Sequence, residues 1–180
     1  MKTTTNKLLN VMHVISWLVF IGLCINVGAL LISFATSLFI NPEGANNIYL
    51  GLNLFDLKEF SNLHFVMIIL LLILIEGLKA LMLYKVVSIF SNIDLVSPFS
   101  QKASKLIAQI SYLAFSIGLS LAIAIYYESW LKIEKNIDLP TLQEYIDGGK
   151  EFLFFAGIIY VISLVFRRGV EYQDELEETV

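Results

Sequence analysis

An apolar stretch from Phe65 to Ile75 runs directly into Glu76 and, three residues later, Lys79. A hydrocarbon core about 30 Å thick requires about 20 helical residues, and the uninterrupted apolar run supplies only about half of them. A membrane-spanning helix in this region must therefore carry both charged side chains into the bilayer. An offset of three places them on one helical face, where an ion pair or shared hydrogen bonds reduce the desolvation penalty. We expect this face to point at other helices and away from lipid.

Two interpretations of the pair are open at this stage. In the first, the pair is structural: Lys79 extends toward the headgroups and Glu76 bonds to it, which holds the helices in register. In the second, the pair is a proton or cation site, because an ionisable residue inside a membrane is by default a functional hypothesis. We favour the structural interpretation.

The rest of the chain has the composition of a membrane protein, with 57% apolar residues, 16% charged residues and three prolines in 180 residues. Four segments are apolar enough to span, at about residues 12–38, 63–87, 105–127 and 150–168. The first is too long for a cleaved signal peptide, so we expect it to be retained. The chain is predicted to be an all-α, polytopic membrane protein. Residues 1–180 form one bundle of four transmembrane helices with short extracytoplasmic loops, and residues 169–180 form an acidic cytoplasmic tail.

Basic residues near the spans predict the orientation, because they tend to stay on the cytoplasmic side. With the N-terminus inside, seven basic residues are cytoplasmic and four are outside. We therefore predict a multi-pass protein of the cell membrane with both termini in the cytoplasm. The seven are Lys2, Lys7, Lys85, Lys102, Lys105, Arg167 and Arg168, and the four are Lys58, Lys132, Lys135 and Lys150.

Small and polar side chains recur along one face of the first span and again in the third, which predicts a helix-packing seam. Small residues let two helix backbones approach closely, and Asn26 can form a hydrogen bond across such a contact. A solvated pore lining is the alternative for Asn26. The seam residues are Gly22, Asn26, Ala29 and Ser33 in the first span and Gly118, with Ala114 and Ala122 at intervals of four, in the third.

The loops carry local structure signals. Alternating aliphatic residues over 48–54 predict a short strand or extended arm. Capping-box spacings that begin at Asp56 and Thr141 predict two helix starts, the second of them a short surface helix that ends before Gly148. Ser97 followed by proline predicts the start of the third membrane helix.

The inner loop is basic and the last span ends in a basic pair followed by carboxylates. Basic residues hold a helix end at anionic headgroups, whereas acidic residues are repelled from the same surface and project into the cytoplasm. We take this surface as a candidate partner-binding region, with a solvated tail as the alternative. Its residues are Lys102, Lys105, Arg167, Arg168, Glu171, Asp174 and Glu175.

The sequence offers no arrangement typical of an enzyme, and we predict that the chain is not one and has no cofactor. His13 and His64 are expected at opposite sides of the bilayer, so no metal site is predicted. Cys24 is the single cysteine, which excludes an intrachain disulfide. A basic stripe on a soluble domain is missing, so no direct contact with nucleic acid is expected.

The inner loop Ser97-Pro98-Phe99-Ser100 and the terminal run from Phe166 to Glu175 resemble a bacterial membrane family catalogued as domain of unknown function 2975. This family commonly has Asn or Gly before the Pro-Phe pair, where this chain has Val96-Ser97. The resemblance implies a four-helix integral membrane protein, often encoded beside a small helix-turn-helix regulator.

Two classes of function follow from the sequence. The favoured one is a membrane-bound partner of such a helix-turn-helix transcriptional regulator. The alternative is a small transporter or channel that uses Glu76 and Lys79, and its size would require a homo-oligomer.

Overall fold

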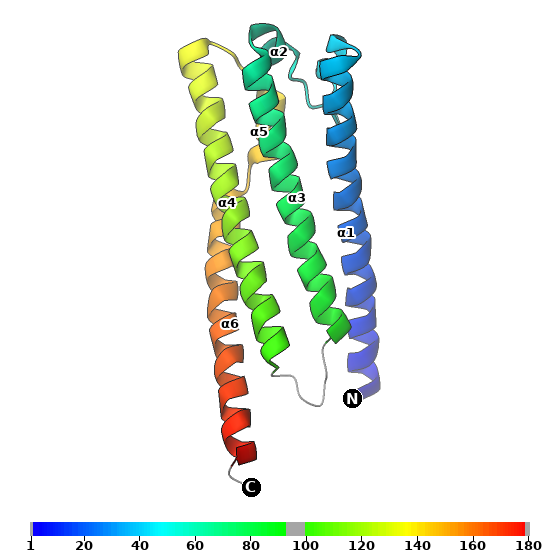
Figure 1. Cartoon of the computed structure of the whole chain (residues 1–180), viewed down its shortest axis with the longest axis vertical. Helices are drawn as coiled ribbons and strands as arrows, with labels where there is room; N and C mark the ends of the chain where they lie inside the picture. The colour runs from blue at the N-terminus through cyan, green and yellow to red at the C-terminus, as the bar shows by residue number, and fades with distance from the viewer. Residues whose placement is uncertain (1, 93–99, 179–180) are drawn as a thin grey trace.

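The computed structural model describes residues 2–92 and 100–178. The elements in chain order are α1 (Lys2–Phe39), the 3-10 helix η1 (Pro42–Asn46), α2 (Phe55–Phe60), α3 (Asn62–Asn92), α4 (Gln101–Lys135), α5 (Pro140–Ile146) and α6 (Gly149–Glu178). The helices α1, α3, α4 and α6 run side by side (Figure 1), and the model has four helices long and apolar enough to cross a membrane. Within the described residues the prediction of an all-α, four-span membrane protein is confirmed.

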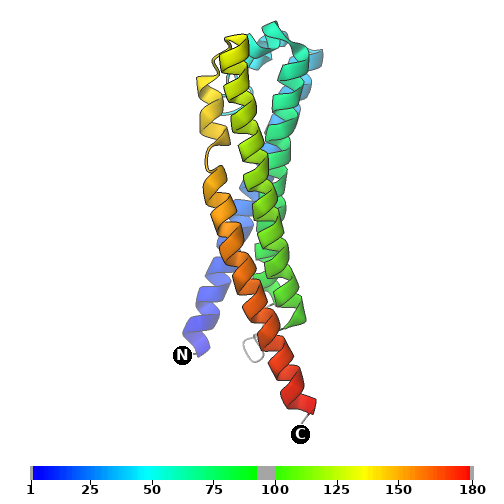
Figure 2. The same ribbon diagram turned by 90° about the vertical axis from the view of Figure 1, so that its left-hand side faces the viewer.

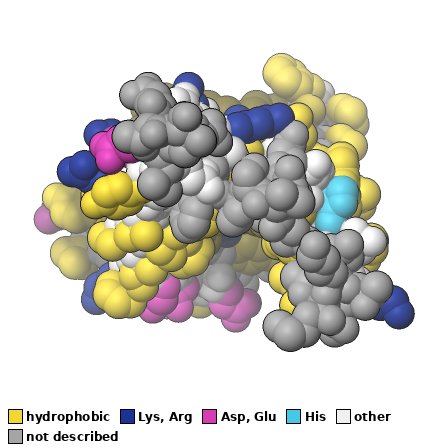
Figure 3. Space-filling model, turned by 90° about the horizontal axis from the view of Figure 1, so that it is seen from below, with side chains coloured by type: hydrophobic (Ala, Val, Ile, Leu, Met, Phe, Trp, Pro, Cys, Tyr) yellow, Lys and Arg dark blue, Asp and Glu magenta, His cyan; other side chains and the backbone are white. Residues whose placement is uncertain are grey.

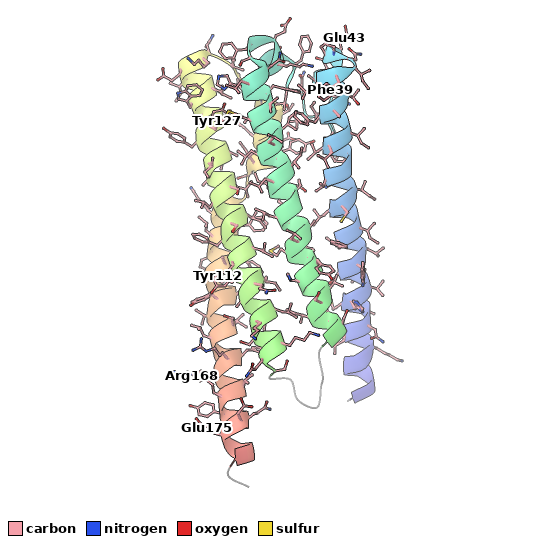
Figure 4. All side chains as sticks on the ribbon, in the orientation of Figure 1. Phe39, Glu43, Tyr112, Tyr127, Arg168 and Glu175 are labelled. Carbon is pink, nitrogen blue, oxygen red and sulfur yellow. The ribbon has the colours of Figure 1, made fainter. Side chains whose placement is uncertain are left out.

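The four long helices form an open row. α3 packs against α1 on one side and α4 on the other, and α6 packs against α4. In the described part of the chain α1 makes no extensive contact with α4 or α6, and the free ends of α1 and α6 point apart (Figure 2). We call the end with both chain termini the terminal end. The opposite end, where Phe39 and Glu43 lie in Figure 4, is the loop end.

The loop end contains most of the buried core. The connection between α1 and α3 folds inward, and its leucines Leu52, Leu54 and Leu57 are fully buried together with Leu142 of α5. The Thr141 hydroxyl accepts a hydrogen bond from the Asn53 N–H at 3.1 Å and lies 3.2 Å from the Asn53 carbonyl. These contacts join two loops that are far apart in the sequence into one cap over the loop end.

Lys58 of α2 ties this cap to α1. Its ammonium group donates a hydrogen bond to the Ser37 carbonyl and lies 5.3 Å from the centroid of the Phe65 ring, within the range of a cation–π interaction. Burial lowers the pKa of the Lys58 amine below its ordinary value, because the charged form loses water.

Of the short strand or extended arm predicted at 48–54, the strand is not found among the described residues, and the chain forms a turn at 48–52. The Ile48 N–H donates to the Leu52 carbonyl at 2.8 Å, while Leu50 has a positive φ of 45° and is exposed. The alternation arises because Ile48, Leu52 and Leu54 insert into the helical core, where a turn satisfies the backbone without a partner strand.

The helix starts predicted at Asp56 and Thr141 are also displaced. The N-cap positions are Leu54 for α2 and Leu139 for α5, and neither has a side-chain cap. The predicted short surface helix ending before Gly148 is present as α5. The start predicted at Ser97 lies outside the described residues, and the N-cap of α4 is Ser100, whose hydroxyl accepts from the Ala103 N–H at 3.1 Å.

The cytoplasmic location of the terminal end stays a prediction, and cysteine labelling tests it. In a Cys24→Ala background, single cysteines at Asn46 and Asp138, both exposed at the loop end, should react with an impermeant thiol reagent in intact cells. Cysteines at Gln101 and Gln173, at the terminal end, should react only after the membrane is permeabilised. The reverse pattern would show that the terminal end faces outward.

Candidate functional site

The Glu76–Lys79 pair forms an ion pair in the middle of α3. The Lys79 ammonium lies 2.7 Å from Glu76 Oε1, and the two side chains are 23% and 17% exposed. Glu76 follows Ile75, which is fully buried, and Lys79 precedes Ala80, which is also buried. The pair therefore lies at the edge of the buried stripe of α3, where each charge has a partner and both keep some access to the surroundings.

Asn26 lies at about the same depth as this pair. The antiparallel helices α1 and α3 are in ring contact between Phe34 and Phe65 and again between Phe20 and Tyr84, so residue 26 is level with about residue 76. The Asn26 side chain accepts a hydrogen bond at 2.8 Å from the Tyr49 hydroxyl of the inserted loop. Its polar side chain thus binds the cap, a contact that the sequence did not indicate.

The other predicted seam residues differ in their surroundings. Ala29 and Ser33 are half-buried, whereas Gly22 is exposed and a Cβ built there would meet nothing within 4 Å. Gly118 is buried in the contact between α4 and α6. A Cβ on Gly118 would lie 2.7 Å from Leu153 Cγ and 3.0 Å from the Gly149 carbonyl oxygen.

The close contact between α4 and α6 extends beyond Gly118 with a period of seven residues. The Ser111 hydroxyl donates to the Ala156 carbonyl at 2.9 Å, and the Ser104 hydroxyl lies 3.4 Å from the Ser163 carbonyl. Small residues on both helices let the backbones approach closely enough for these side-chain to backbone hydrogen bonds. We call this contact the α4–α6 seam.

At the terminal end the seam opens into a pocket with a cavity volume of about 270 Å³. Three of the predicted partner-binding residues, Lys105, Arg167 and Glu171, line it together, although they come from two helices. Figure 3, a view of this end, shows Lys and Arg side chains beside Asp and Glu side chains on its left-hand side. The full lining is Gln101, Ser104, Lys105, Arg167, Val170 and Glu171.

The remaining predicted partner-binding residues lie around this pocket or beyond it. Arg168 Nη1 donates to Glu171 Oε2 at 3.0 Å. Lys102 is exposed near the start of α4, and Asp174 and Glu175 are exposed on the continuation of α6. In Figure 4, Glu175 lies farther along α6 than Arg168. The predicted acidic tail is thus a helical extension of the last span through Glu178.

Glu128 is a buried carboxylate that the sequence reasoning missed. It is 4% exposed, and its Oε1 accepts a hydrogen bond from Gln143 Nε2 at 3.1 Å. It borders a cavity of about 520 Å³ at the loop end, together with Glu144 and Asp147. Its register was the available signal, because Glu128 continues the helical stripe of buried residues in α4.

Comparison with known protein families finds a match over most of the chain. The family described as "Protein of unknown function (DUF2975)" matches residues 39–180. Neither a curated protein nor a solved structure matches significantly.

Proposed function

We propose that this chain, which belongs to the DUF2975 family of proteins of unknown function, is a non-catalytic membrane partner of a small basic regulatory protein. The observation that carries the proposal is the continuation of α6 as an unbroken helix from the last span through Glu178. Asp174 and Glu175 follow Glu171 by three and four residues, which places both of them next to Glu171 on the helix surface.

An acidic helical face supports this role through charge complementarity. The DNA-binding face of a helix-turn-helix regulator is basic, so a row of carboxylates can cover it and compete with DNA phosphates. Arg167 and Arg168 already neutralise Glu171, at 3.3 and 3.0 Å, and thereby fix the base of the extension at the membrane. Asp174 and Glu175 lie one turn farther out and are exposed. The extension therefore presents its charge away from the bilayer.

The test is recovery of the product of the adjacent gene, which the family resemblance implies is a helix-turn-helix protein. The variant Asp174→Asn, Glu175→Gln, Glu177→Gln, Glu178→Gln should bind it about tenfold or more weakly than the intact chain, with a lower salt dependence. The matched control removes four exposed carboxylates at the loop end with Glu43→Gln, Glu59→Gln, Glu134→Gln and Glu144→Gln, and should bind normally. Equal binding by all three proteins would remove the extension from the mechanism.

A small transporter or channel is the second candidate. The observation in its favour is the partial exposure of Glu76 and Lys79 at mid-depth in α3. Because the pair is partly exposed, the Glu76 carboxylate can exchange Lys79 for a proton or a cation, and such a step is typical of ionisable residues in transport paths. In this role the chain would act as a homo-oligomer, since four spans in an open row enclose no path of their own.

A further inference from the structure

The terminal-end pocket brings together cationic side chains from two helices. Lys105 comes from the first turns of α4 and Arg167 from the part of α6 just beyond its apolar stretch. Lys105 makes no hydrogen bond or ion pair within the part of the chain that the structure describes, and its side chain is exposed at the pocket. Of the two cations that share this cavity, Arg167 is therefore paired with Glu171, whereas Lys105 has no such partner among the described residues.

The charges of the pocket lining sum to a net positive charge, although the lining includes the carboxylate of Glu171. Its Oε1 accepts from Arg167 Nε at 3.3 Å and its Oε2 from Arg168 Nη1 at 3.0 Å. Each guanidinium carries five N–H donors in a planar fork that matches a carboxylate or a phosphate. The lining therefore carries two cations, Lys105 and Arg167, and one carboxylate, Glu171, which is also paired with Arg168 outside the lining.

The pocket also lies at a defined depth. Lys105 directly precedes the apolar part of α4, and Arg167 directly follows the apolar stretch of α6 that ends at Phe166. This position corresponds to the headgroup region, where basic pockets between helices attract anionic lipid headgroups. Val170 supplies an apolar wall, and the cavity of about 270 Å³ is large enough for a phosphate ester group.

We propose that this pocket binds a phosphate ester, and that the phosphate belongs to the headgroup of an anionic phospholipid. Lys105 and Arg167 bind the phosphate oxygens, Gln101 offers an amide donor at the rim, and Val170 contacts the glycerol end of the lipid. A soluble phosphate ester shares this chemistry and differs only in its source. The site shares Glu171 with the base of the acidic extension but does not include Asp174 or Glu175, and it requires no protein partner.

Native mass spectrometry of the full chain in neutral detergent tests the site with phosphatidylglycerol, phosphatidylcholine and glycerol 3-phosphate as probes. The intact chain should retain phosphatidylglycerol in preference to phosphatidylcholine. In the variant Lys105→Gln, Arg167→Gln the dissociation constant for phosphatidylglycerol should rise about 25-fold, from about fivefold for each basic residue at a membrane surface. The exchange Lys105→Arg, Arg167→Lys keeps both charges and should retain most of the binding.

The matched control is Lys7→Gln, Lys85→Gln, which removes two charges from the same end of the bundle but none from the pocket. It should bind phosphatidylglycerol like the intact chain. If glycerol 3-phosphate binds with the same dependence on Lys105 and Arg167, the site is a phosphate site and its ligand is soluble. Equal weakening in the pocket variant and the control, or the absence of binding in both arms, would overturn the proposal.

Discussion

Replacement of Gly118 by valine is expected to lower the free energy of unfolding by about 1–3 kcal/mol, the range for overpacking a close contact. The reason is geometric: the first carbon of any side chain at this position lies 3.0 Å from the Gly149 carbonyl oxygen. That oxygen belongs to the backbone of α6 and cannot rotate away. The two helices must therefore separate, which also lengthens the hydrogen bonds of Ser104 and Ser111 to α6.

The matched control is Gly22→Val, since Gly22 is also inside a span but has nothing within 4 Å of its built Cβ. Reversible unfolding in bicelles should show a lower free energy of unfolding for Gly118→Val and little change for Gly22→Val. A graded variant sharpens the test: Leu153→Ala removes the side-chain part of the clash, at 2.7 Å, but leaves the Gly149 carbonyl. The double variant Gly118→Ala, Leu153→Ala should therefore lose less of the free energy of unfolding to this clash than Gly118→Ala alone. Equal effects at both glycines would contradict the seam.

The four spans could be predicted from the sequence because the bilayer fixes the length and polarity of any segment that crosses it. The same reasoning located Glu76 and Lys79, since an offset of three is a local property of one helix. Their ion pair required no knowledge of other elements. The depth of Asn26 relative to this pair, in contrast, depends on how α1 and α3 are aligned.

The α4–α6 seam follows steps of seven residues, whereas the sequence analysis named small residues at steps of four. Ala114, Gly118 and Ala122 recur at intervals of four, but each such step overshoots a turn of 3.6 residues by about 40°. Ala122 is exposed as a result. Steps of seven undershoot two turns by only about 20°, so Ser104, Ser111 and Gly118 stay on the contact.

The cap at the loop end could not be predicted because its contacts join distant parts of the chain. Alternation at 48–54 is a period-two signal, and a turn produces the same signal when flanking residues such as Ile48, Leu52 and Leu54 insert into a core. The capping-box spacing at Thr141 failed for a related reason, since its hydroxyl binds Asn53 of the other loop. The phosphate pocket likewise depends on the pairing of α4 with α6, which brings Arg167 to Lys105.

Removal of one charge from the Glu76–Lys79 pair is expected to destabilise the protein more than removal of both. Glu76→Gln or Lys79→Met alone leaves an unpaired charge at mid-depth in α3, and each should cost about 1–3 kcal/mol. This cost is below the cost of breaking a fully buried ion pair, because the side chains of Lys79 and Glu76 are still 23% and 17% exposed. The double variant contains no unpaired charge and should recover part of the loss, measured as a coupling energy in a double-mutant cycle.

The Lys132–Asp138 pair provides the control for this cycle. Its N–O distance of 2.9 Å is similar, but its side chains are 50% and 59% exposed. Exposed pairs contribute about 0–1 kcal/mol, so Lys132→Met and Asp138→Asn should give little coupling.

The same Glu76 and Lys79 variants, reconstituted in liposomes, separate the two candidate functions. A loss of stability without any proton or cation flux in the intact chain supports a structural pair, because a charge needed only for transport would leave stability unchanged. Flux that disappears in stable single variants would instead assign Glu76 and Lys79 to a transport path.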